Sequence, residues 1–294
     1  MTGKNYLRGV IAAVPTPFTS DLQPDTGRFV ALAKWLLDNG CDALNVCGTT
    51  GEATSMSVAQ RKALMSAAAN ALPRERLMVG TGAASIADTI ELTLHAGQLG
   101  FAGALLLPPF YYKNIPDEGV IGYFDLIAQM TSAHPCPMYL YHFPALAGIP
   151  FHPALVEQLR ARLGHRLRGI KDSSGDMAYA REIAAQSKAF DVFPSSEAAL
   201  MEARDGIFAG CISATANLSS HLCAAAYHRG DSAALAIASA VRQRVVSGPL
   251  IPGIKAAVAA TMNDPSYAAM LPPQMTLSKK ESFHLISDLK AILR

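Results

Sequence analysis

Short apolar segments alternate with amphipathic segments along most of the chain, and this alternation restricts the fold more than any other feature. Short runs rich in Val, Ile, Leu and Ala are typical of parallel strands that are buried on both faces. Such runs occur at 10–14, 43–46, 77–80, 103–107, 138–141, 167–170, 191–193 and 210–213. Between them, apolar residues recur at helical spacing, and Ser57 with Gln60 and Ser85 with Asp88 form N-cap signals for two helices.

Eight predicted strands, each followed by a predicted helix, are typical of an α/β fold of the (β/α)8 TIM-barrel type. A doubly wound open sheet shows the same alternation and is the alternative. We favour the barrel because the count reaches eight and because the chemically interesting residues follow strand ends, which converge on one mouth of a barrel. After residue 229 only helical segments follow, at 231–246, 253–262 and 278–293. The sequence therefore predicts a catalytic barrel over residues 1–229 and a C-terminal helical extension over 230–294.

Charge and composition argue against several classes of partner. Lys and Arg number 25 against 23 Asp and Glu, and no basic stripe stands out, so we expect no nucleic-acid partner. The longest apolar stretch, 101–112, is too short to cross a bilayer, so we expect no membrane partner. The five cysteines are scattered without a CxxC pair, which argues against disulfides and favours a reducing, cytoplasmic location.

Motifs for a metal or a nicotinamide cofactor are missing from the sequence. The eight histidines lack metal-ligand spacing. The segment Gly80-Thr81-Gly82 begins like a dinucleotide-binding fingerprint, but the third glycine and the later acidic residue are absent. We therefore expect neither a metal nor a dissociable cofactor.

Lys171 follows the predicted strand 167–170 and precedes Asp172. A lysine at a strand end is often simply solvated. At the C-terminal end of a barrel strand, however, it points into a largely apolar mouth, where desolvation favours the neutral amine that attacks carbonyl carbons. The residues alone leave both interpretations open, a solvated lysine and a Schiff-base nucleophile.

The segment Gly48-Thr49-Thr50-Gly51-Glu52 follows the predicted strand 43–46. Backbone N–H groups of a glycine-flanked turn, together with two hydroxyls, can hold a carboxylate or a phosphate. The alternative is a capping box formed by Thr49 and Glu52. Both interpretations are compatible with each other.

Tyrosines gather after two neighbouring strands. Tyr111 and Tyr112 follow the fourth predicted strand, while Tyr139 and Tyr141 lie on the fifth, where alternation places them on one face. A phenol near a protonated imine can shuttle protons, although tyrosines often only pack. His142 faces the other way and is interpreted as a packed histidine.

Together these residues resemble the pyruvate-dependent class I aldolases of the dihydrodipicolinate synthase and N-acetylneuraminate lyase family. The resemblance runs from Pro15-Thr16-Pro17-Phe18 to Ser213-Ala214-Thr215-Ala216-Asn217. The motifs that carry it follow successive strands in the family's order: Gly48-Thr49-Thr50-Gly51-Glu52, Phe110-Tyr111-Tyr112, Tyr141-His142-Phe143-Pro144 and Gly169-Ile170-Lys171-Asp172.

The resemblance implies a role for each matching residue. Lys171 matches the Schiff-base lysine that attacks the 2-keto carbon, and Tyr141 matches the tyrosine that shuttles protons. Thr49 and Thr50, directly after Gly48, match the pair that holds the substrate carboxylate. Thr49 also matches the residue that links two tyrosines in a proton relay.

The resemblance also implies a shared site in an oligomer. Tyr112 matches the tyrosine that family members lend across a dimer interface, and Tyr111 is the alternative because 111–116 is one residue longer than in the lysine-pathway enzymes. Ile212 matches an apolar residue beside bound pyruvate. Family members are commonly dimers of dimers, so we expect a homotetramer.

Two departures from the family pattern restrict the class of substrate that we expect. Leu146 stands where the lysine-pathway synthases carry an arginine for the aldehyde's carboxylate, and a leucine cannot form that charge-assisted pair. Ser195, Ser196 and Glu197, after the strand 191–193, are candidates for binding the hydroxyls of a sugar acid. At these substrate-binding positions the match to the family pattern is partial.

The expected function is therefore a class I lyase that cleaves or forms a 2-keto-3-deoxy sugar acid or a related pyruvate aldol. Its substrates would be pyruvate and an aldehyde or a 2-keto acid, with no cofactor beyond the covalent Schiff base through Lys171. One alternative is a 4-hydroxy-tetrahydrodipicolinate synthase or a dehydratase of the same family, since these share the lysine. A non-catalytic barrel that binds a keto acid is the alternative from another class.

Overall fold

The computed structural model describes residues 7–294, and residues 1–6 of the predicted barrel region lie outside the described residues. Parallel strands form one eight-stranded sheet in the order β7-β6-β5-β4-β3-β2-β1-β8. Their bounds are β1 Gly9–Ala13, β2 Ala43–Val46, β3 Leu77–Gly80, β4 Gly103–Leu106, β5 Met138–His142, β6 Leu167–Asp172, β7 Asp191–Pro194 and β8 Gly210–Ser213. The Ala209 N–H, next to β8, donates to the Val192 carbonyl of β7 at 3.0 Å.

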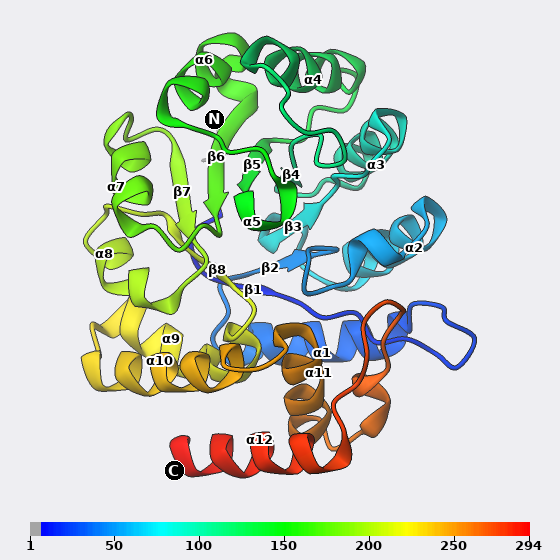
Figure 1. The fold of residues 1–294 in the computed structure, drawn as a ribbon, viewed down its shortest axis with the longest axis vertical. Coiled ribbons are helices and arrows are strands. Elements are labelled where there is room, and N and C mark those ends of the chain that lie inside the picture. The colour runs from blue at the N-terminus through cyan, green and yellow to red at the C-terminus, as the bar shows by residue number, and fades with distance from the viewer. Residues whose placement is uncertain (1–6) are drawn as a thin grey trace.

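This last bond joins the two edges of the sheet, so the strands form a nearly closed barrel with helices around it (Figure 1). The predicted (β/α)8 barrel is confirmed, and the open sheet is excluded. Each predicted strand lies within one residue of its observed bounds, except that β6 continues two residues further, through Lys171 to Asp172. Lys171 is thus part of a strand and not of the loop after it.

Helices surround the strands and follow their order. Their bounds are α1 Thr26–Asp38, α2 Val58–Ala71, α3 Ile86–Leu99, α4 Asp117–Met130, α5 Pro144–Ala147, α6 Pro153–Leu163, α7 Met177–Ala185, α8 Leu200–Arg204 and α9 Ala216–Arg229. Short 3-10 helices span Ala53–Ser55 (η1), Arg74–Arg76 (η2), Gly164–Arg166 (η3), Glu197–Ala199 (η4) and Pro265–Ala268 (η5). The Ser57 hydroxyl accepts from the Gln60 N–H in a full capping box, and Ser85 accepts from the Asp88 N–H, as predicted.

Strand alternation divides the buried side chains into two layers. Residues that face the barrel interior pack together and include Ile11, Met78, Tyr139, Phe193 and Ile212. Residues of opposite parity pack against the helices in a larger second cluster. Both faces of the strands are therefore apolar, which explains why the strands read as continuous apolar runs.

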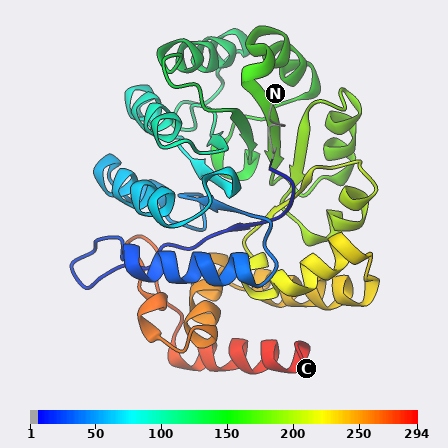
Figure 2. The same ribbon diagram turned by 180° about the vertical axis from the view of Figure 1, so that it is seen from behind.

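The chain ends in a group of helices below the barrel, α10 Ser232–Val246, α11 Leu250–Thr261 and α12 Lys279–Ile292. Helices α10 and α11 pack against α9, and α12 packs against α10 and α11, so that the three form one group at an end of the ribbon (Figures 1 and 2). The three helices predicted after residue 229 lie within a few residues of these bounds. Gly230, with a φ of +70°, ends α9 in the left-handed conformation that glycine adopts most easily.

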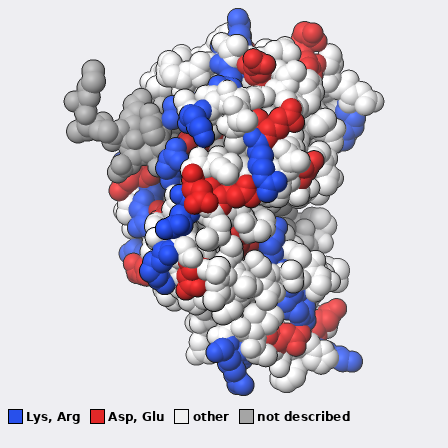
Figure 3. Space-filling view, turned by 90° about the vertical axis from the view of Figure 1, so that its left-hand side faces the viewer, with Lys and Arg blue, Asp and Glu red and all other residues white. Residues whose placement is uncertain are grey.

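On the face in Figure 3, basic and acidic side chains are interspersed. Among residues 7–294, no helix has both the length and the apolar character needed to cross a membrane.

Candidate active site

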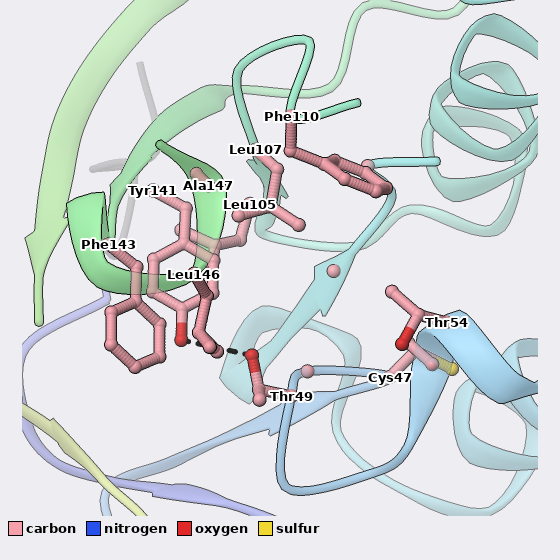
Figure 4. Close-up of a pocket in the computed structure, with 14 residues that line it drawn as sticks. Cys47, Thr49, Thr54, Leu105, Leu107, Phe110, Tyr141, Phe143, Leu146 and Ala147 are labelled. Atoms are coloured by element: carbon pink, nitrogen blue, oxygen red, sulfur yellow. Dashed lines mark hydrogen bonds between the residues drawn. The ribbon is translucent and has the colours of Figure 1, made fainter. Parts of the chain in front are cut away.

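The structure brings Lys171, Tyr141 and Thr49 together at the C-terminal ends of their strands. Lys171 of β6 pairs in register with Tyr141 of β5, and both side chains are buried. The Lys171 Nζ atom lies 3.2 Å from the Tyr141 Oη atom. The Tyr141 Oη atom lies 3.1 Å from the Thr49 Oγ1 atom, the hydrogen bond drawn in Figure 4. A lysine amine, a phenol and a threonine hydroxyl thus form one hydrogen-bonded chain.

The surroundings of Tyr141 favour its ionised form. Burial of the phenol raises its pKa, but the nearby Lys171 ammonium and hydrogen bonds with Thr49, Lys171 and Ser173 act in the opposite direction. The balance holds the pKa of Tyr141 below its ordinary value of 10.0. A phenol with a lowered pKa is better suited to accept a proton near neutral pH.

The loop that carries Thr49 has a strained backbone on both sides. Cys47 and Glu52 have φ values of 51° and 55°, in the left-handed region that non-glycine residues rarely adopt. Gly80 makes room for this loop, because a Cβ atom there would lie 2.2 Å from the Cys47 carbonyl oxygen. Such strain persists only where the surrounding structure holds it, and it gathers at functional sites.

Glu52 anchors the far end of the loop through a buried ion pair. Its carboxylate lies 2.5 Å from the Nζ atom of Lys255 on α11 and accepts the Leu271 N–H at 2.9 Å. Lys255 also donates to the Thr16 carbonyl at 2.8 Å. The alternative interpretation of Thr49 and Glu52 as a capping box is wrong, since these partners occupy the Glu52 carboxylate. Lys255 is not among the residues predicted from the sequence, although a single lysine within the apolar helix 250–261 is a signal for a buried pair.

A cavity of about 250 Å³ is lined by Tyr141 and Thr49. Lys171 is not among its lining residues and adjoins it through its contact with Tyr141. Of the predicted site residues, Gly48, Thr49, Tyr141 and Leu146 line it (Figure 4). The cavity is also lined by residues that were not predicted as site residues: Cys47, Ala53, Thr54, Gly80, Gly82, Leu105, Leu107, Phe110, Phe143 and Ala147. Within the described part of the chain, no group of three or more His, Cys, Asp or Glu is placed to hold a metal ion.

Thr50 and Ile212 lie close to this site without lining the cavity. Thr50 is buried in the loop after β2, and Ile212 packs in the barrel-interior cluster with Tyr141 and Phe193. Ile212 therefore lies under the site, among the side chains that support Tyr141. The predicted roles of both residues stay predictions.

Tyr111 and Tyr112 both point to the surface. Their exposed fractions are 74% and 65%, and their rings pack edge to face with centroids 5.5 Å apart. The neighbouring Phe110 lines this chain's cavity instead. The prediction that Tyr112 or Tyr111 completes the site of a second copy is compatible with this exposure and stays a prediction.

Ser195, Ser196 and Glu197 are not brought to the cavity. The Glu197 carboxylate is fully buried, where it accepts from Ser213 Oγ at 2.6 Å and lies 3.3 Å from Arg242 Nη1 of α10. The Ser196 hydroxyl caps η4, and the Ser195 carbonyl accepts from Arg242. These contacts tie β7, β8 and α10 together. The three residues do not line the cavity, and their predicted role in binding a substrate stays a prediction.

His142 packs behind the barrel wall, as the sequence predicts. Its ring stacks on Tyr179 of α7 at 4.5 Å, and its Nδ1 atom accepts the Phe151 N–H at 3.1 Å. Burial lowers the pKa of His142 to about 4. The ring is therefore neutral at pH 7 and supports the position of β5.

Comparison with known proteins agrees with this geometry. The model of the dihydrodipicolinate synthetase family matches residues 6–292. The chain belongs to the dihydrodipicolinate synthetase family. The predicted family and the predicted class, a lyase, are both confirmed by this match and by relatives that bear synthase and aldolase names.

Two relatives match this chain at similar sequence identity but over different lengths. An uncharacterized DapA-like lyase of Chloroflexus aurantiacus is 35% identical over 280 residues, which cover 93% of each protein. The putative 2-dehydro-3-deoxy-D-gluconate aldolase YagE of Escherichia coli K12 is 35% identical over 176 residues, which cover 60% of this chain and 57% of YagE.

Solved structures of the family have the same fold. Dihydrodipicolinate synthase from Agrobacterium tumefaciens C58 superposes with a TM-score of 0.90 at 25% identity, covering 97% of this chain and 99% of that one. The structure of YagE from Escherichia coli K12 in complex with pyruvate superposes with a TM-score of 0.88 at 28% identity, covering 97% of this chain and 98% of YagE.

Proposed function

We propose that this chain is a class I, Schiff-base lyase that cleaves or forms an aldol of pyruvate. The observation that carries the proposal is the hydrogen-bonded series Lys171, Tyr141 and Thr49, of which Tyr141 and Thr49 line an apolar cavity. It supplies a nucleophile for a keto carbon and a proton acceptor beside it. The pyruvate complex of the related YagE supports pyruvate as the substrate.

In the first step, the neutral amine of Lys171 attacks the C2 carbonyl of the 2-keto acid. The carbinolamine that results loses water and leaves a protonated imine between Nζ and C2. The substrate carboxylate is held by the hydroxyls and N–H groups of Thr49 and Thr50. Tyr141, 3.2 Å from Nζ, is close enough to exchange the protons that formation and loss of the hydroxyl require.

In the second step, the bond between C3 and C4 breaks. Its electron pair moves toward the protonated imine and gives an enamine, while the proton of the C4 hydroxyl passes to the Tyr141 phenolate and an aldehyde leaves. The lowered pKa of Tyr141 favours the phenolate that this step needs. Protonation at C3 and hydrolysis of the imine then release pyruvate and free Lys171.

The identity of the aldehyde distinguishes an aldolase for sugar acids from the alternative synthase. A 2-keto-3-deoxy sugar acid is the aldol that the sequence predicts, and an acidic semialdehyde is the partner in the alternative synthase reaction. Leu146 lines the cavity and offers no charge to a carboxylate, which argues against the semialdehyde. A dehydratase uses the same imine but removes water and keeps the carbon chain.

The proposal includes an assembly and a location. A homotetramer built from two dimers would let the exposed Tyr112, or Tyr111, extend the relay from Thr49 of a second copy. No cofactor enters any step, because Lys171 itself forms the covalent intermediate. A cytoplasmic location agrees with five free cysteines, all buried.

The test is turnover with pyruvate by the wild-type protein and two variants. Lys171→Ala should abolish formation and cleavage of pyruvate aldols. Tyr141→Phe should lower kcat by about 10²- to 10⁴-fold, the usual contribution of a positioned proton donor or acceptor, while pyruvate still binds. Mass analysis of the products separates an aldolase, which changes the carbon chain, from a dehydratase, which does not.

The non-catalytic alternative predicts a different result. Pyruvate would bind in a calorimetric titration, yet no aldehyde would make the protein consume it. Wild-type turnover by Lys171→Ala would refute the proposed nucleophile.

A further inference from the structure

The wall of the cavity above Tyr141 offers almost no polar side chain to a substrate. Its side chains come mostly from two phenylalanines, three leucines and two alanines (Figure 4). Of the residues that line it, Thr49, Thr54 and Tyr141 are the ones with hydroxyl groups, and none carries a formal charge as Lys, Arg, Asp or Glu. Thr49 and Tyr141 are already bonded to each other, so Thr54 alone supplies a hydroxyl to the upper wall.

Backbone carbonyls along the wall have partners that lie outside the cavity. The Gly80 and Gly82 carbonyls accept from the guanidinium of Arg61 at 2.8 and 3.0 Å. At the opposite side, the Ala147 carbonyl accepts from Lys113 Nζ at 3.0 Å. These three carbonyls of the wall are therefore already bonded within the protein.

Lys113 and Arg61, the two cations bonded to carbonyls of the wall, are engaged by those bonds. Lys113 donates to the Phe110 carbonyl at 2.5 Å as well as to Ala147, and it does not line the cavity. Arg61 is buried behind the wall with the two glycine carbonyls. A substrate carboxylate on the aldehyde side would consequently lose its hydration without meeting a cation, which is costly.

We infer that the aldehyde partner carries an apolar alkyl or aryl substituent, and not a polyhydroxylated or carboxylated chain. This inference rests on the proposed pyruvate chemistry and names its second substrate. The wall presents carbon atoms to the substituent, and burial of apolar surface against them favours it. Among the hydroxyls that line the wall, only that of Thr54 is not bonded to another lining hydroxyl, so a polyhydroxylated chain would be desolvated against a mostly apolar wall, which disfavours a sugar acid.

Matched pairs of aldehydes test the inference. 2-Methylbutanal has the skeleton of glyceraldehyde with a methyl group in place of each hydroxyl. 4-Methylpentanal has the skeleton of succinic semialdehyde with an isopropyl group in place of the carboxylate. We expect kcat/KM for condensation with pyruvate to be at least about tenfold higher for the apolar member of each pair, since a desolvated polar group without a partner costs that much or more. A preference for glyceraldehyde or succinic semialdehyde would overturn the inference.

A variant at the rim tests whether the wall causes the preference. Leu146 lines the cavity but is 60% exposed, so Leu146→Asn should fold normally. It should lower the ratio of kcat/KM for 2-methylbutanal over glyceraldehyde by at least about threefold. Met130→Asn, at a 58% exposed position of α4 away from the cavity, is the matched control and should leave the ratio unchanged.

Borohydride reduction with pyruvate alone separates this inference from the proposed function. A covalent adduct combined with a preference for the polar aldehydes would overturn the inference and leave the Schiff-base chemistry intact. The absence of an adduct and of turnover with all four aldehydes would overturn both.

Discussion

Replacing Lys255 with methionine removes one partner of the buried ion pair beneath the Thr49 loop. Both side chains of the pair, Lys255 and Glu52, are 1% exposed. The methionine fills a similar volume but leaves the Glu52 carboxylate without its cation and the Thr16 carbonyl without the donor that lies 2.8 Å away. Removing one partner of a buried pair typically costs about 3–5 kcal/mol, because a buried charge is left uncompensated.

This loss should be visible in both chemical and thermal unfolding. For a chain of this size, each kcal/mol lowers the melting temperature by roughly 2–4 °C, so Lys255→Met should melt about 10 °C below the wild type. Circular dichroism in a urea titration and in a thermal scan measures the two quantities. The double variant Glu52→Gln with Lys255→Met should recover part of the loss, since neither charge then remains buried.

The matched control is an exposed ion pair of the same residue types. Lys62 lies 3.0 Å from Glu91, and their side chains are 36% and 52% exposed. Lys62→Met should change the free energy of unfolding by no more than about 1 kcal/mol, because water screens such pairs. If Lys255→Met costs no more than Lys62→Met, the reasoning about the buried anchor is refuted.

Three further predictions concern the barrel and its proton chemistry. Thr49→Val removes a hydrogen bond that lowers the pKa of Tyr141, so the rise of kcat with pH should move to higher pH; an unchanged profile would contradict the relay. Gly80→Ala places a Cβ atom 2.2 Å from the Cys47 carbonyl oxygen and should lower both stability and kcat, whereas wild-type behaviour in both would contradict the packing. Burial lowers the pKa of His142 from 6.5 to about 4, so the unfolded state binds its proton first as the pH falls. Stability should therefore decline between pH 6.5 and 4, by up to about 3 kcal/mol, and be unaffected by this group above pH 6.5. His142→Phe should remove that decline in urea titrations, and an equal decline in both proteins would contradict the assignment.

The barrel and the base of the site follow from local signals in the sequence. Buried parallel strands are apolar on both faces, so each one corresponds to a short continuous apolar run in the sequence. Lys171, Tyr141 and Thr49 lie at or just after the ends of these runs. Because strand ends converge on one mouth, residues 92 and 30 positions from Tyr141 meet at hydrogen-bonding distance. Recognising these as Schiff-base groups needed the family resemblance.

The remaining features depend on contacts that a single sequence does not mark. Glu52 and Lys255 are 203 positions apart, and no period links them. Glu197 follows β7 as a mouth residue would, yet its carboxylate turns inward to Arg242, whose position depends on how α10 packs. The apolar wall of the cavity combines residues such as Phe110, from the loop after β4, and Leu146, from the short helix α5, whose relative positions are set by tertiary packing.

The central claim is that Lys171 forms the covalent intermediate with a 2-keto acid, and borohydride trapping with pyruvate tests it most directly. After reduction, peptide mass mapping should place one adduct on the peptide that contains Lys171, and the adduct should be absent from Lys171→Ala. Tyr141→Phe should still give the adduct, more slowly. An adduct confined to the rim residue Lys113, or none on the folded protein, would contradict the account.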